Sequence, residues 1–130
     1  VVEASLKAAG ITTDGLVIEN GAGLSRRERI TARSLGQLLQ AAWRSRTMPE
    51  LVSSLPIAGR DGPARRRVAN SPSAGAAHIK TGTLDGVRSL AGYVLGASGR
   101  RYVVVLMINH PNAGAARDTQ DALLEWVAGQ

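Results

Sequence analysis

The strongest structural signal in this sequence lies in residues 77–108, which read AHIKTGTLDGVRSLAGYVLGASGRRYVVVLMI. This pattern predicts three strands, at residues 77–83, 87–95 and 101–108. Asp85-Gly86 and Ser98-Gly99 separate the three segments, and both pairs are typical of turns that join antiparallel strands. Residues 103–108 are apolar without interruption, so we expect the third strand to be covered on both faces.

The segments on either side of these strands favour helices. The clearest prediction is a helix over residues 32–46, since Thr31 can cap it and apolar residues recur at helical spacing, namely Leu35, Leu38, Leu39, Ala42 and Trp43. Shorter helices are expected at residues 1–9, ending at Gly10, at 49–54 and at 114–127, with a short strand at 16–19. Residues 55–77 are irregular. The predicted class is α+β, an antiparallel sheet flanked by helices in one domain over residues 1–130.

Composition narrows the possible functions. The net charge is +6, and 14 of the 16 basic residues are Arg. Aromatic stacking platforms and recognisable nucleic-acid modules are missing, so a solvated basic surface is favoured over nucleic-acid binding. The absence of Cys excludes disulfides, thiolate metal sites and a Cys nucleophile, and neither a metal nor a cofactor is expected. No run approaches the ~18 apolar residues of a transmembrane segment.

Lys80-Thr81-Gly82-Thr83, at the end of the first predicted strand, is the candidate functional motif. A Lys on a strand beside small Thr and Gly residues offers a cation, a hydroxyl and backbone that a ligand can approach closely. These groups suit the recognition of a carboxylate and the stabilisation of a developing oxyanion. The motif is short, and a Lys that protects an edge strand from aggregation is the alternative interpretation.

Three runs in order carry a resemblance to a known family: residues 19–26 (ENGAGLSR), 54–62 (SLPIAGRDG) and 80–94 (KTGTLDGVRSLAGYV). They resemble stretches of the class C low-molecular-mass penicillin-binding proteins, which are serine D-alanyl-D-alanine carboxypeptidases and endopeptidases. The sequence departs from the family pattern at Glu19-Asn20, at Ala22 and at Pro63, which weakens any role for the first loop.

The resemblance implies the C-terminal portion of a penicillin-binding transpeptidase, or serine β-lactamase-like, fold. It implies an acyl-enzyme reaction on peptidoglycan stem peptides, which β-lactams would mimic, in the periplasm or cell envelope. By this resemblance, Lys80 supplies positive potential and Thr81 holds the substrate's terminal carboxylate. Gly82 lets the substrate lie close to the strand, and the Thr83 backbone N–H forms half of the oxyanion hole.

The family's other two motifs, Ser-x-x-Lys and Ser-x-Asn, do not occur in this sequence. In the family both precede the Gly-Leu-Ser run, so we expect them upstream of Val1, in a portion that would be a partner of this chain. The chain would then be a mature, cleaved or truncated product, inactive by itself. A non-catalytic basic α+β binding or interaction module is the alternative. Two weaker patterns, a Ser71, His78 and Asp85 triad and a His78–His110 metal site, are rejected because neither has supporting residues.

Overall fold

The computed structural model describes residues 1–23 and 25–130. Leu24, which belongs to the run at residues 19–26, lies outside the described residues. Along the chain the elements are α1 (Val2–Ala8), α2 (Ala32–Trp43), α3 (Met48–Ser54), η1 (Gly62–Ala64), β1 (Ala77–Leu84), β2 (Val87–Leu95), β3 (Arg101–Asn109), η2 (Ala113–Ala116) and α4 (Arg117–Ala128).

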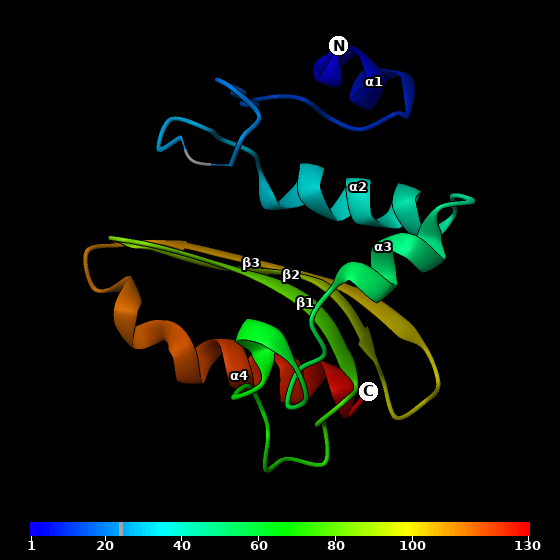
Figure 1. Ribbon diagram of the computed structural model, residues 1–130, viewed down its shortest axis with the longest axis vertical. Coiled ribbons are helices and arrows are strands. Elements are labelled where there is room, and N and C mark those ends of the chain that lie inside the picture. The colour runs from blue at the N-terminus through cyan, green and yellow to red at the C-terminus, as the bar shows by residue number, and fades with distance from the viewer. Residues whose placement is uncertain (24) are drawn as a thin grey trace.

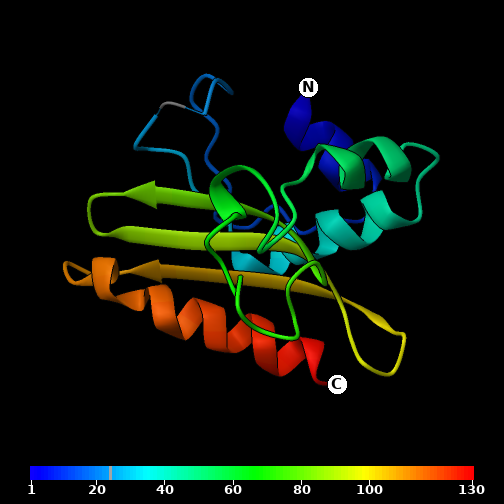
Figure 2. The ribbon, with the colours of Figure 1, turned by 60° about the horizontal axis from the view of Figure 1, so that its bottom comes forward.

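The three strands form one antiparallel sheet in the order β1-β2-β3, which Figure 2 shows side by side. The turn at Asp85-Gly86 pairs Leu84 with Val87, and the second turn pairs Leu95 with Arg101. Each predicted strand is confirmed, and β1 and β3 each extend one residue further than predicted. The turn residues therefore fix the register of both hairpins.

Helices cover both faces of the sheet (Figure 1). On the α4 face, the core contains Ile79, Leu90, Val94, Val104 and Leu124. On the α2 face, the buried Tyr93 donates a hydrogen bond of 2.7 Å to the Leu39 carbonyl, and its ring lies 5.1 Å from that of Trp43. β3 has a helix on each side, as predicted, but Val104 is its one fully buried residue.

Some predicted boundaries were wrong. Thr31 caps α2 as expected, accepting the Ser34 N–H at 3.0 Å, but the helix ends at Trp43 instead of residue 46. The Ser45 hydroxyl bonds the Ala42 carbonyl at 2.7 Å and so satisfies the last turn. Residues 16–19 form no strand, because Val17 makes only an isolated bridge with Arg29. Residues 113–116 form a 3₁₀ turn, so the last helix begins at Arg117.

The irregular segment before β1 is held in place at two points. Its first part runs beside β1: the Ile79 N–H donates to the Pro56 carbonyl at 2.9 Å, and the Ala58 N–H donates to the Ala77 carbonyl at 2.8 Å. Its middle is tied to α4 by Arg67, which bonds Asp121 at 2.7 Å and the buried Gln120 at 2.6 Å. Arg67 is therefore a structural residue and not part of the solvated basic surface that we expected.

Candidate active site

The candidate motif lies on an open edge of the sheet. β1 is an edge strand, and the Pro56–Ala58 segment covers its outer side only as far as Ile79. Backbone groups of alternate residues in a strand point to the same side. Because the Ile79 N–H points to the outer edge, the N–H and C=O groups of Thr81 and Thr83 point there too. Two neighbouring backbone donors are therefore presented along an edge that no other described strand occupies.

Lys80 adds a positive charge to this edge. Its side chain is exposed, and its Nζ donates a 2.7 Å hydrogen bond to the Thr81 carbonyl, which lies on the open side. It forms no ion pair with a carboxylate among residues 1–23 and 25–130. The ammonium group is thus held against the edge and keeps its charge available for an anionic ligand.

The four motif residues alternate between the two faces of β1. Ile79 packs in the core against α4, so Thr81 and Thr83 project to the α4 face. Lys80 and Gly82 lie on the α2 face. Gly82 is opposite Ser89 of β2, and a β-carbon on Gly82 would lie 2.5 Å from the Ser89 Oγ. The cation and the residue without a side chain therefore share one face, next to the Ser89 hydroxyl group.

A cavity of about 540 Å³ opens beside the end of the motif. Leu84 lines it from β1, Asp85 from the following turn, Ser89 from β2, and Ser25 and Arg26 from the loop before α2. The structure thus brings part of the run at residues 19–26 to the same end of the sheet as Lys80–Thr83. From the sequence alone, that loop had no assigned role and Ser89 was not recognised as a site residue. The Asp85-Gly86 turn contained the missing signal, because a two-residue turn places residue 89 opposite residue 82.

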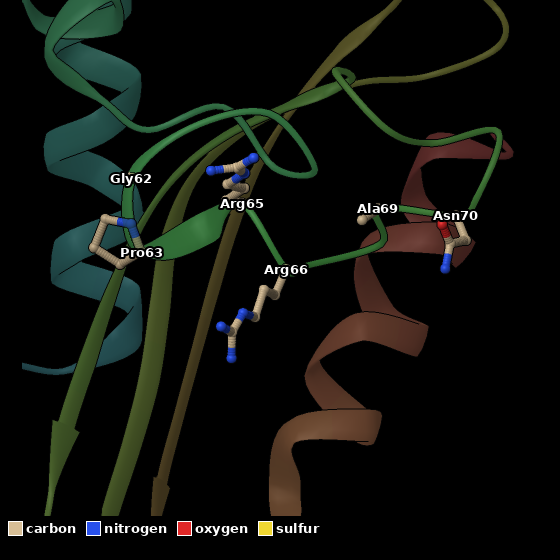
Figure 3. A pocket seen from close by; sticks show the side chains of 6 residues that line it. All are labelled: Gly62, Pro63, Arg65, Arg66, Ala69 and Asn70. Atoms are coloured by element: carbon tan, nitrogen blue, oxygen red, sulfur yellow. The ribbon is translucent and has the colours of Figure 1, made fainter.

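A larger cavity lies elsewhere, on the segment between η1 and β1. It measures about 860 Å³ and is lined by Gly62, Pro63, Arg65, Arg66, Ala69 and Asn70. Figure 3 shows the Arg65 and Arg66 side chains pointing in different directions, so their guanidinium groups do not converge on one ligand. The smaller cavity adjoins the motif at Leu84, whereas no residue of β1 lines the larger one, and we place the candidate site at the β1 edge on chemical grounds.

The rejected patterns do not assemble in the structure. His78 and Asp85 lie at opposite ends of β1, a separation of about 23 Å for a strand of this length, so no Ser-His-Asp triad forms. The His78 Nδ1 is buried without a hydrogen-bond partner among the described residues.

No helix in the described part of the chain has the length and apolar character needed to cross a membrane.

Comparison with known proteins supports the fold and places the chain among carboxypeptidases. The chain is 34% identical over 133 residues to a D-alanyl-D-alanine carboxypeptidase of Actinomadura sp. (strain R39), an alignment that covers 98% of this chain and 24% of the relative. It is 39% identical over 126 residues to the carboxypeptidase DacB of Mycolicibacterium smegmatis, covering 91% of this chain and 27% of that protein. The chain therefore spans about a quarter of the length of these relatives.

A solved structure shows the same architecture. The crystal structure of penicillin binding protein 4 from Haemophilus influenzae, complexed with a β-lactam, superimposes with a TM-score of 0.79 at 26% identity. The superposition covers 95% of this chain and 32% of that one, which identifies the fold as part of a penicillin-binding fold. The family match extends over all of residues 1–130, and the chain belongs to the D-Ala-D-Ala carboxypeptidase 3 (S13) family.

Proposed function

We propose that the complete protein is a serine-type D-Ala-D-Ala carboxypeptidase that binds penicillin and cleaves peptidoglycan stem peptides through an acyl-enzyme. The observation that carries the proposal is the open edge of β1. There, backbone N–H groups of Thr81 and Thr83 lie beside the Lys80 ammonium, which is held 2.7 Å from the Thr81 carbonyl. An extended peptide that ends in a carboxylate can pair with such an edge and place its terminal charge near the cation.

Each motif residue has a role in this proposal. The Thr83 N–H donates to the oxygen that becomes negatively charged when the penultimate D-Ala carbonyl is attacked. Lys80 provides positive potential in the cleft, and Thr81 helps to bind the terminal carboxylate through its edge-facing backbone N–H, since its side chain lies on the α4 face. Gly82 presents no side chain, so the substrate backbone can approach the strand.

The nucleophile of the proposed reaction is a Ser outside residues 1–130, in a Ser-x-x-Lys motif. Its Oγ bonds to the carbonyl carbon while its proton passes to the neighbouring base. The C–N bond then breaks, and terminal D-Ala leaves as an amine that has taken up a proton. Water next attacks the ester, which releases the shortened peptide and restores the Ser hydroxyl. The nucleophile's own N–H supplies the second oxyanion donor.

The partner of this chain in the proposal is the remaining part of the same protein. Several large apolar side chains lie exposed among the described residues: Val1, Val2, Val17, Ile18 and Trp126, the last 65% exposed. Trp126 also lines a cavity of about 400 Å³ beside β3, together with Val103 and Val105. Val1, Val2, Val17 and Ile18 line another pocket, near α1, so the exposed apolar side chains form two separate groups. Exposed apolar groups of this kind are typical of surfaces that another part of a protein covers. Residues 1–130 are then the C-terminal segment of the transpeptidase-like domain, in an enzyme of the periplasm or cell envelope.

Labelling the complete protein with a fluorescent penicillin, followed by protease digestion and mass spectrometry, tests this proposal. We expect one acylated Ser, located outside residues 1–130 and followed by Lys three positions later. Excess unlabelled penicillin should abolish the label, as should prior heat denaturation. An acylated residue inside residues 1–130 would contradict the assignment. A complete protein that takes up no label, yet cosediments with peptidoglycan, would favour the non-catalytic binding module.

A further inference from the structure

Ser89 occupies the space that a side chain on Gly82 would need. The two residues are paired across β1 and β2, and a β-carbon built on Gly82 would lie 2.5 Å from the Ser89 Oγ but 3.8 Å from the Ser89 Cβ. The first distance is shorter than non-bonded contacts allow, whereas the second is an ordinary van der Waals contact. The hydroxyl group alone therefore fills the position above Gly82.

The register places this hydroxyl in the cleft. Gly82 and Lys80 lie on the same face of β1, and their partners Ser89 and Ala91 lie on the same face of β2. Ser89 is consequently diagonal to Lys80, within the distance range in which side chains of adjacent strands interact. It also lines the cavity of about 540 Å³ next to Leu84.

Ser89 has unused hydrogen-bonding capacity. Its side chain is half-buried, yet its hydroxyl makes no hydrogen bond with any other residue of the described ranges 1–23 and 25–130. A Ser hydroxyl can donate one hydrogen bond and accept two. By contrast, Arg88, the preceding residue, uses its guanidinium to bond the carbonyls of Leu84 and Val87, at 2.8 Å each, and so braces the hairpin. Ser89 contributes no such brace.

We propose that Ser89 is a further substrate-contacting residue of this cleft, whose hydroxyl hydrogen-bonds an amide or carboxylate group of the acyl donor above Gly82. This inference rests on the proposed function, because it needs a substrate lying along the β1 edge. It also gives Gly82 a second role: residue 82 lacks a side chain so that the Ser89 hydroxyl can reach the surface of the cleft.

The steric part of the inference has its own test, independent of activity. In the complete protein, Gly82→Ala places a methyl group against the Ser89 Oγ and should lower the melting temperature. Adding Ser89→Ala removes the close contact and leaves the two β-carbons 3.8 Å apart. The double variant should therefore regain most of the lost melting temperature. If Gly82→Ala costs the same in both backgrounds, the Ser89 hydroxyl does not fill this space and the inference fails.

The functional part is tested by the kinetics of Ser89→Ala in the complete protein. Loss of one neutral hydrogen bond should reduce the penicillin acylation rate and the kcat/KM for a D-Ala-D-Ala peptide by about three- to tenfold. Ser89→Thr, which keeps the hydroxyl, should restore both to within about threefold. Ser98→Ala, at an exposed turn, is the matched control and should change neither. Rates are compared per folded molecule, so a loss of stability is not mistaken for a loss of contact.

The outcomes also separate this inference from the proposed function. A normal rate in Ser89→Ala together with a strongly reduced rate in Lys80→Ala would overturn the role of Ser89 and leave the function standing. Normal rates in both variants would overturn the proposed function as well. A reduced rate in Ser89→Ala that Ser89→Thr does not restore would show that the hydroxyl is not the group that acts.

Discussion

Gly92 in β2 lies opposite Ile79 of β1, where a side chain would meet the β1 backbone, and we predict that Gly92→Ala disrupts the sheet. A β-carbon there would lie 2.1 Å from the His78 carbonyl oxygen and 2.9 Å from the Ile79 Cα. Carbon and oxygen atoms normally approach to about 3.3 Å, so the contact is short by about 1 Å. Both neighbours are backbone atoms, so no change of rotamer relieves the clash, and β1 would have to move away from β2.

Two terms set the cost of this substitution. Overpacking an interior position costs about 1–3 kcal/mol. The Gly92 φ of +156° is one that L residues rarely adopt, which adds backbone strain of about 1–3 kcal/mol. The sum, about 2–6 kcal/mol, is a large part of the ~5–15 kcal/mol that stabilises a typical domain. Ile79, opposite Gly92, precedes Lys80, so displacing β1 should also slow acylation by penicillin.

Thermal unfolding of the complete protein, followed by circular dichroism, measures the effect against two control variants. Gly99→Ala lies at a turn with φ of +79° and no atom within 4 Å, so it should carry only the backbone strain. Gly36→Ala lies within α2, also with open space, and should be neutral or stabilising by about 0.5–1 kcal/mol. A melting temperature for Gly92→Ala equal to that of Gly99→Ala would refute the close approach of β1 and β2.

Three further predictions concern stability. Arg67→Ala should lower the free energy of unfolding by about 2–4 kcal/mol, somewhat less than the ~3–5 kcal/mol for a fully buried ion pair, because the Asp121 side chain is 22% exposed. Urea unfolding should show this loss, whereas Arg65→Ala, at an exposed position, should cost under ~0.5 kcal/mol. Equal unfolding midpoints for the two variants would contradict the structural role of Arg67. Burial raises the pKa of Tyr93 above 10.0, so its contribution to stability is complete below that pH and is lost as the pH rises through the folded-state pKa. Tyr93→Phe should cost about 1 kcal/mol at pH 7, because the hydrogen bond to the Leu39 carbonyl is lost. As the pH rises above 10.0, the parent protein should lose more stability than Tyr93→Phe does; parallel pH profiles would contradict this. Residues 1–130 alone should aggregate, or should unfold below the ~45 °C that is typical of the least stable mesophile domains. A soluble monomer that unfolds cooperatively well above this temperature would show that the exposed surface around Trp126 does not need to be buried by another part of the protein.

The strands were predictable because their signals are local. Asp85-Gly86 and Ser98-Gly99 mark the turns, and the residues between them have high strand propensity, so each predicted end lies within one residue of the observed one. Helix ends were less predictable, since no Gly or Pro occurs between Trp43 and Met48 to mark the end of α2, where the Ser45 hydroxyl bonds the Ala42 carbonyl. Residues 16–19 have strand-like composition, but only Val17 finds a bridge partner.

The site was predictable in part for the same reason. Lys80–Thr83 stood out because the motif and its strand are contiguous in sequence. The open edge could not be predicted, since it depends on the Pro56–Ala58 segment ending its contact with β1 at Ile79. The roles of neighbouring Arg residues were equally hidden: Arg67 is buried against α4, while Arg65 and Arg66 are exposed, and composition alone does not distinguish the three.

The rate of penicillin acylation in Lys80→Ala tests the central claim most directly, namely that the β1 edge around Lys80 is the substrate cleft. Loss of a preorganised charge typically costs about 2.7–4 kcal/mol in the transition state, so soluble, folded Lys80→Ala should be acylated ~10²–10³-fold more slowly than the parent protein. Lys80→Arg should restore little, because a planar guanidinium does not replace a compact ammonium whose Nζ lies 2.7 Å from the Thr81 carbonyl. A rate for Lys80→Ala within about threefold of the parent would instead show that Lys80 merely protects a sheet edge, and would contradict this account.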